Sequence, residues 1–288
     1  MLSNKKYLRT FDNYANIKFK EDLKFDINNI IKVDIPTKKT LFVLKNVLTY
    51  SEVNNLIKKS EPHYKKLDDE YLIVERDSYR VLSNDTVFAK VLFERIKPYL
   101  TQKIKPCGFG VQGKWIPHKI NQCFRFCKYI SKSKGFKPHR DATYIENEDI
   151  RSILTVIIYL NDSDTCTTFY KTNTKRKIYQ TVEDEMMGGF VERFKYKPEK
   201  GSILIFNHDM IHAGNPVIDE QNKYIIRSDI VYIRKHKDEE EIERKWLKNP
   251  YFIETIKLYR EAFNQELDGN IEESSLLYKK ALALRQFH

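Results

Sequence analysis

The stretch that decides the fold is Ser152-Ile-Leu-Thr-Val-Ile-Ile-Tyr-Leu160, a short apolar run rich in β-branched residues. Its composition favours a strand that is buried in a core. Similar runs lie on both sides of it, and turn residues such as Asn161–Asp164 and Glu199–Gly201 bound several of them. The predicted strands in this part of the chain are residues 122–130, 152–160, 203–207 and 224–233.

Two helices are predicted before these strands, after a further β-type run at residues 40–47. The first begins near Thr49 or Ser51, either of which can cap a helix N-terminus. The second covers Asp85–Leu100, with one apolar stripe formed by Val87, Val91, Leu92, Ile96 and Leu100. Helices followed by many short strands predict an α+β fold, with the strands in a sandwich or jelly roll.

Both ends of the chain differ from this β-rich part. Residues 1–36 are polar and irregular, which predicts an N-terminal arm before a main domain at 37–236. Residues 237–288 begin with a charged linker and then return to helical periodicity. Four tail residues fit a tetratricopeptide-like hairpin: Gly269, Tyr278, Ala281 and Leu282. Because one such unit cannot bury its own apolar face, we expect the helical tail to pack on the main domain.

The chain has 51 basic and 40 acidic residues, a net charge of +11. The excess lies between Arg95 and Arg140, where 12 basic residues and no acidic residue occur. This local charge predicts an anionic partner, either a small dianion near a pocket or a nucleic acid. The four cysteines do not form a disulfide scaffold, and no signal peptide or membrane span is evident, so we expect a cytoplasmic protein without membrane contact.

Two motifs suggest other chemistry but lack the required context. Gly108-Phe-Gly-Val-Gln-Gly113 matches the dinucleotide pattern, but no predicted strand precedes it and the next acidic residue is Asp141. Cys123 and Cys127, with His118, have no second ligand pair for a zinc site. We interpret the glycines as a loop, the thiols as core residues and His118 as a loop histidine.

His139 and Asp141 are two residues apart at the end of a predicted strand. Side chains at this spacing point to the same side of a strand, so both can reach one cation. A later histidine, His208 or His212, would complete a two-histidine-one-carboxylate set. Such a set binds non-haem Fe(II) and leaves coordination positions open.

The order of these segments resembles the Fe(II)/2-oxoglutarate-dependent dioxygenases, and within them the prolyl 4-hydroxylase-like branch. The resemblance covers roughly residues 40–234 and rests on six stretches: Asn121–Tyr129, Gly135–Asp141, Leu154–Asn161, Gly201–Phe206, His212–Val217 and Lys223–Asp229. It implies a double-stranded β-helix (jelly roll) core with flanking N-terminal helices and a C-terminal helical tail. It also implies His139, Asp141 and His212 as iron ligands, because the Gly-x-Pro-Val stretch follows His212 and not His208.

The resemblance further implies residues that hold 2-oxoglutarate. Tyr129 matches a tyrosine near the carboxylate at the metal, and Tyr159 matches one near the distal carboxylate. Lys223 matches the basic residue that pairs with the distal carboxylate, while Arg227 on the same strand face is a rival for that role. Arg125 shares the strand face of Tyr129 and is expected to face the same pocket.

The implied activity is hydroxylation of a protein or peptide with Fe(II), 2-oxoglutarate and O2, with ascorbate as reductant. An alternative is a nucleic-acid oxygenase or demethylase that binds through residues 95–140. A non-catalytic jelly-roll binding module is disfavoured because the three ligand positions are intact. The sequence departs from the family at Asp164–Phe169, which lacks the usual double glycine, so the substrate-side wall is left unpredicted.

Overall fold

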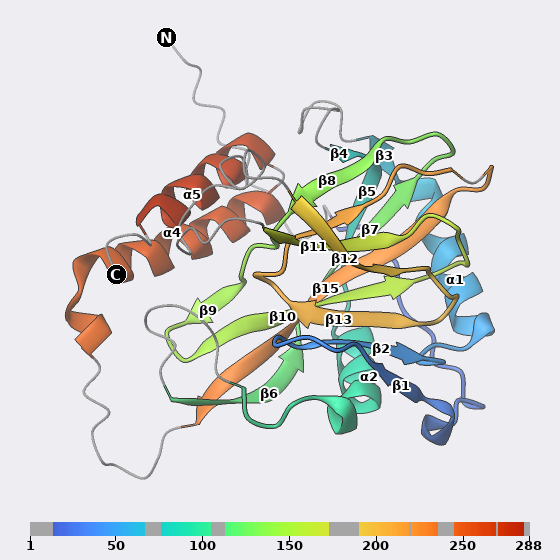
Figure 1. The fold of residues 1–288 in the computed structure, drawn as a ribbon, viewed down its shortest axis with the longest axis horizontal. Coiled ribbons are helices and arrows are strands. Elements are labelled where there is room, and N and C mark those ends of the chain that lie inside the picture. The colour runs from blue at the N-terminus through green and yellow to red at the C-terminus, as the bar shows by residue number, and fades with distance from the viewer. Residues whose placement is uncertain are drawn as a thin grey trace.

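The computed structural model describes residues 14–66, 76–104, 113–172, 190–218, 220–235, 245–268 and 270–284. Within them, two antiparallel sheets face each other (Figure 1). The larger sheet contains β1 (Ile31–Asp34), β2 (Leu41–Lys45), β13 (Ile203–Asn207), β10 (Ile150–Tyr159), β15 (Lys223–Lys235), β7 (Cys123–Tyr129), β5 (Tyr79–Asn84) and β3 (Lys65–Lys66) in that order, with β6 (Lys114–Ile120) on β15 and β9 (Ile145–Asn147) on β10. The smaller sheet has the order β12 (Phe190–Tyr196), β11 (Thr167–Thr172), β14 (His212–Gly214), β8 (Gly135–His139) and β4 (Arg76–Asp77). The predicted α+β jelly roll is confirmed.

Helices α1 (Tyr50–Ser60) and α2 (Thr86–Ile96) begin at side-chain caps. Thr49, rather than Ser51, caps α1 in a reciprocal capping box with Glu52. Asp85 caps α2 by accepting two backbone N–H bonds. The predicted stripe of α2 was wrong at Val87, which is 60% exposed, because the buried face follows Phe88 and its neighbours instead.

The side chains of β7 alternate between the two faces of the larger sheet, as predicted for a strand. Phe124 and Phe126 belong to the core that includes the buried faces of α1 and α2. Cys127 and Tyr129 face the opposite side, toward the cluster between the two sheets. One face of β7 therefore builds the core, and the other is available to line a site.

Strand β10 contains a β-bulge between Ser152 and Leu154, which the sequence does not reveal. Regular alternation along residues 151–159 predicts that Arg151 and Ile153 share a face with Thr155 and Tyr159, and this prediction is wrong. Ile153 instead belongs to the helix-side core, and the Arg151 guanidinium lies over the Trp115 ring. The extra residue at the bulge reverses the facing of the preceding part of the strand.

At the C-terminal end, α4 (Pro250–Leu267) and α5 (Ile271–Leu284) form a helical hairpin, which we call the tail hairpin (Figure 1). The helices contact each other through the rings of Tyr259 on α4 and Tyr278 on α5, whose centroids are 5.9 Å apart. Ile145 of β9 packs in the same apolar cluster as Leu258 and Ala262 of α4, so the hairpin rests on the jelly roll. Gly269, the charged linker at 236–244 and most of the glycine pattern, residues 108–112, lie outside the described residues.

At the N-terminal end, the described part of the predicted arm is integrated into the fold. Ile17, Phe19 and Ile30 are buried in the main core, and β1 pairs with β2. None of the helices in the described segments is both long enough and apolar enough to span a bilayer.

Candidate metal centre and its pocket

His139, Asp141 and His212, which we call the candidate triad, lie together where β8 ends and β14 begins in the smaller sheet. His139 ends β8 and His212 begins β14, and the two residues are direct partners in the antiparallel ladder. One possible ligand atom from each of the three residues lies within 4.8 Å of the others. The sequence spacing and the strand pairing together therefore place two imidazoles and a carboxylate around one point, which is the donor set expected for Fe(II).

Both triad imidazoles are oriented by backbone carbonyl groups. Nδ1 of His139 lies 2.8 Å from the carbonyl oxygen of Lys137, and Nδ1 of His212 lies 3.1 Å from that of Met210. Because a carbonyl can only accept, each Nδ1 carries the proton and each Nε2 keeps a free lone pair. Both Nε2 atoms face Asp141: that of His139 lies 3.9 Å from Oδ1, and that of His212 lies 3.5 Å from Oδ2.

Apolar rings surround the two imidazoles. Phe136 stacks on His139 with a centroid distance of 3.6 Å, and Phe206 meets His212 edge-on at 4.6 Å. Burial, reinforced by the neighbouring His212, lowers the pKa of His139 to about 3. Burial also lowers the pKa of His212. Both rings are therefore neutral near pH 7, the form that binds a metal ion.

Asp141 stays ionised in this setting. Burial alone would raise the pKa of its carboxyl group, but the charge of Arg227 holds that pKa well below its usual range. Arg227 Nη2 lies 3.3 Å from Asp141 Oδ1 and 3.0 Å from Asp229 Oδ1. Thr155 Oγ1 donates to Asp141 Oδ2 at 2.7 Å.

His208, the rival for the third ligand position, is engaged elsewhere. Its Nδ1 lies 2.8 Å from Thr155 Oγ1, and its Nε2 lies 2.7 Å from Ser152 Oγ. Both ring nitrogens therefore have hydrogen-bond partners, and neither is free for a cation. Burial lowers the pKa of His208 to about 4, so this imidazole is neutral as well.

A cavity of about 200 Å³ opens beside the candidate triad. Tyr129 and Lys223 lie opposite each other at one end of it, as partners on β7 and β15. Lys223 is buried and donates to the Thr165 carbonyl oxygen at 2.8 Å. Tyr159 is fully buried behind Thr167, with their hydroxyl oxygens 2.8 Å apart, and Thr167 is the one that lines the cavity.

The opposite end of the cavity is lined by the tail hairpin. Arg125 Nε and Nη2 bind Glu266 of α4 at 2.9 Å and 2.7 Å, and Arg80 Nη1 lies 3.6 Å from the same carboxylate. Burial opposes ionisation of Glu266, but the charges of Arg125 and Arg80 lower its pKa to about 2. Further lining residues from the hairpin are Phe263, Ser274, Ser275 and Tyr278. Sequence reasoning missed these residues, because nothing in the tail pattern indicates a partner for Arg125.

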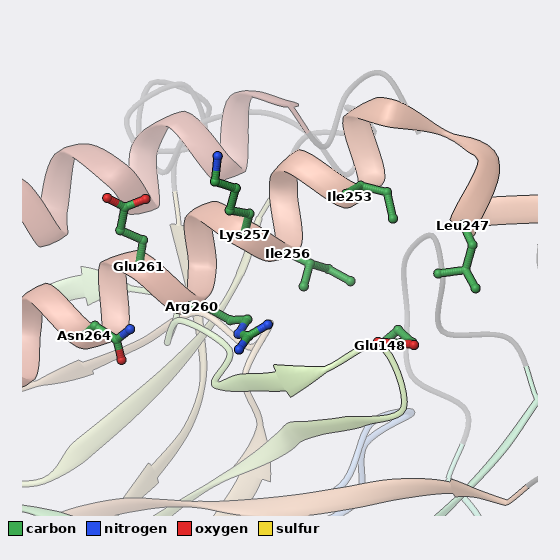
Figure 2. A pocket seen from close by; sticks show the side chains of 8 residues that line it. All are labelled: Glu148, Leu247, Ile253, Ile256, Lys257, Arg260, Glu261 and Asn264. Carbon is green, nitrogen blue, oxygen red and sulfur yellow. The ribbon is translucent and has the colours of Figure 1, made fainter.

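Other candidates lie away from this centre. Cys123 and Cys127 are buried free thiols, and Cys107 lies outside the described residues. His118 was predicted in a loop, and this was wrong: it lies on β6, a strand whose alternation is weak because Pro117 interrupts it. A larger hollow, of about 420 Å³, lies between α4 and the turn that joins β9 to β10 (Figure 2). It shares no residue with the cavity at the triad.

Part of the basic segment 95–140 is paired within the fold, since four of its 12 basic side chains contact acidic residues in the described part of the chain. Acidic residues from other parts of the chain contact its side chains in four ion pairs: Arg95 with Glu52, Lys119 with Glu146, Arg125 with Glu266 and Lys128 with Glu61. These four pairs offset part of the local excess of 12 positive charges that the sequence shows.

One family model matches the part of the chain that contains the candidate triad. Residues 124–228 match the family model described as the 2OG-Fe(II) oxygenase superfamily, and this segment contains the whole triad. No curated protein matches the chain. One similar solved structure is a Pseudomonas putida prolyl-4-hydroxylase, with 13% identity, coverage of 69% of this chain and 95% of that chain, and a TM-score of 0.41. A second is a Trichoplax adhaerens prolyl hydroxylase in complex with a hypoxia inducible factor peptide, with 15% identity, coverage of 68% of this chain and 84% of that chain, and a TM-score of 0.42. A third is HygX from Streptomyces hygroscopicus with nickel and 2-oxoglutarate bound, with 10% identity, coverage of 72% of this chain and 90% of that chain, and a TM-score of 0.41.

Proposed function

We propose that this protein, an enzyme whose residues 124–228 belong to the 2OG-Fe(II) oxygenase superfamily, hydroxylates a residue of a protein or peptide. The observation that carries the proposal is the convergence of His139, Asp141 and His212 inside the matched segment. The peptide class is supported by the sequence motifs, whose order resembles the prolyl 4-hydroxylase-like branch.

The donor set fits Fe(II). Two neutral imidazoles with free Nε2 lone pairs and one ionised carboxylate can hold the metal and leave positions open for other ligands. When bound, Fe(II) with 2-oxoglutarate and O2 supplies the oxidising power for C–H hydroxylation, while 2-oxoglutarate is converted to succinate and CO2. Ascorbate is the proposed reductant that keeps the iron in its ferrous form. The aromatic rings around the imidazoles exclude water from this side of the centre.

For the cosubstrate, we assign the end of the cavity that contains Lys223 and Tyr129. Lys223 is the proposed partner of the distal carboxylate, because the Arg227 guanidinium already lies within 3.3 Å of two carboxylates, those of Asp141 and Asp229. Arg227 then has a different task, which is to keep Asp141 ionised. Tyr129 is placed to approach the inner carboxylate, and Thr167 with Tyr159 behind it completes the distal end.

The substrate is assigned to the other end, beneath the tail hairpin. This end mixes the aromatic ring of Phe263 with polar groups from Ser274, Ser275 and Tyr278. Arg125, included among the predicted cosubstrate residues, serves here to hold Glu266 and thereby the hairpin. One residue of a peptide is the proposed occupant of this end, in line with the resemblance of the sequence motifs to the prolyl 4-hydroxylase-like branch.

The test is succinate formation by the full chain with Fe(II), 2-oxoglutarate and ascorbate, with peptide and oligonucleotide libraries assayed side by side. We expect turnover with members of the peptide library, and its loss in His139→Ala. His118→Ala, an exposed histidine on β6, is the matched control and should retain turnover. Absence of 2-oxoglutarate turnover with every substrate, or unchanged turnover in His139→Ala, would contradict the oxygenase assignment. Turnover with oligonucleotides alone would contradict the peptide class.

A further inference from the structure

A chain of hydrogen bonds leads from the backbone of Tyr144 to the carboxylate of Asp141. Tyr144 N donates to Ser152 Oγ at 2.8 Å, Ser152 Oγ lies 2.7 Å from His208 Nε2, and His208 Nδ1 lies 2.8 Å from Thr155 Oγ1. Thr155 Oγ1 completes the chain by donating to Asp141 Oδ2 at 2.7 Å. Ser152, Thr155 and His208 are all buried, so no bulk water competes for these bonds.

The donor and the acceptor of each hydrogen bond in this chain follow from the Asp141 carboxylate at its end. An ionised carboxylate only accepts, so the Thr155 hydroxyl must donate to Asp141 and can accept only from His208 Nδ1–H. His208 Nε2 is then an acceptor, and the Ser152 hydroxyl donates to it. Ser152 in turn accepts from the Tyr144 backbone N–H. All the groups are satisfied in a single arrangement, which fixes the tautomer of His208.

The β-bulge of β10 is what makes the chain possible. Ser152 and Thr155 are three residues apart, and in a regular strand their side chains would point to opposite faces. The register shift between Ser152 and Leu154 brings both onto the face of His208. His208 also contacts Asp141 through the main chain, because the Asp141 N–H donates to its carbonyl oxygen at 3.2 Å.

We propose that Ser152, His208 and Thr155 are positioning residues for the metal, which act by holding the carboxylate of Asp141 in one orientation. This inference rests on the proposed function, in which the candidate triad binds Fe(II). Thr155 is the contact with the ligand, His208 orients Thr155, and Ser152 orients His208. Residues that hydrogen-bond a metal ligand commonly change metal affinity by about 10–100-fold when they are removed.

The test measures binding of Mn(II), a redox-stable probe of the site, to the full chain without 2-oxoglutarate. The EPR signal of free Mn(II) gives the Kd. Thr155→Val keeps the shape of the side chain but removes the hydroxyl, and we expect it to raise the Kd by about 10–100-fold. Thr155→Ser retains the hydroxyl and should restore the affinity to within about threefold of the natural chain. His208→Leu should weaken binding, while His208→Asn, which keeps a donor near the Nδ1 position, should weaken it less.

Thr168→Val is the matched control. Thr168 is as buried as Thr155, and its hydroxyl donates to Asn215 Oδ1 at 2.8 Å instead of to the triad. This variant should lose stability in EDTA about as Thr155→Val does, yet bind Mn(II) like the natural chain. Equal Mn(II) affinity in Thr155→Val and the natural chain, or an equal loss in Thr168→Val, would overturn the positioning role. Failure of the proposed function looks different, because the natural chain would then bind Mn(II) no better than His139→Ala does.

Discussion

The two ends of the cavity are built in different ways. At the candidate triad, His139 and His212 are direct ladder partners on neighbouring strands of one sheet, and Asp141 follows the end of β8 by two residues. At the tail hairpin, the central contact joins Arg125 to Glu266, residues 141 positions apart in the sequence. The first end is fixed by the strands that form the fold, and the second depends on a helix added to it. The two ends meet at Tyr144, which starts the hydrogen-bond chain to Asp141 and whose ring contacts Phe263 of α4 at 4.8 Å.

Removing a ligand should have the largest effect and should be confined to the triad end. His139→Ala deletes one of the three proposed metal donors, so we expect Mn(II) binding to fall to background and 2-oxoglutarate turnover to stop. Thermal unfolding in EDTA should change little beyond the loss of the ring contacts with Phe136. A large loss of stability with metal binding intact would mean that His139 is a core residue and not a ligand.

Disrupting the ion pair at the tail hairpin should have the opposite effect, which is lower stability with metal binding retained. Glu266→Gln removes the buried negative charge that faces Arg125 and Arg80, and breaking such a pair from one side costs about 3 kcal/mol or more. We expect lower stability in urea unfolding and faster proteolysis of the tail. The Mn(II) affinity, measured under conditions in which the variant is folded, should be unchanged. Glu261→Gln, an exposed position on the same helix, is the control. Equal losses in the two variants would remove the special role of Glu266.

The same ion pair makes a pH prediction. The pKa of Glu266 is lowered to about 2 in the folded chain, from the ordinary value of 4.5. A carboxylate with a depressed pKa stabilises the fold above its unfolded value and loses that contribution as the pH falls through its folded value. The stability difference between the natural chain and Glu266→Gln should therefore be full above pH 4.5 and shrink toward pH 2. A difference that stays constant over this range would contradict the assigned pairing.

A smaller effect separates the two basic residues on β15. Lys223→Met removes the proposed partner of the distal carboxylate, and charge-assisted hydrogen bonds of this kind contribute about 1.5–3 kcal/mol. The KM for 2-oxoglutarate should rise by about 10–100-fold, with Mn(II) affinity retained. Arg227→Met should instead weaken Mn(II) binding, because Arg227 faces Asp141. If Arg227→Met raises the KM and Lys223→Met does not, the two roles must be exchanged.

The same contrast explains what the sequence could predict. The strands, the start of α1 at Thr49 or Ser51 and the pair His139 and Asp141 follow from spacing over a few residues, while His212 was chosen over His208 only through the family resemblance. The face of Tyr129 follows from strand alternation. The bulge in β10 has no sequence signal, so the facing of Arg151 and Ile153 was wrong, and the chain from Ser152 to Asp141 could not be foreseen. Likewise, no local pattern links the tail to Arg125. Contacts that depend on a register shift or on long-range docking require the three-dimensional structure.

The smallest predicted effect comes from a substitution at the α1 cap, far from both ends of the cavity. It tests whether metal and cosubstrate binding are independent of the stability of the whole fold. Thr49→Ala removes the capping box of α1, in which Thr49 Oγ1 accepts from Glu52 N at 3.2 Å and Glu52 Oε2 accepts from Thr49 N at 2.9 Å. Loss of such a cap costs about 1 kcal/mol. Urea unfolding should show this loss, while Mn(II) affinity and the KM for 2-oxoglutarate stay unchanged. A shift in either binding constant would mean that the triad responds to stability changes anywhere in the jelly roll, and the separation between the two ends would no longer hold.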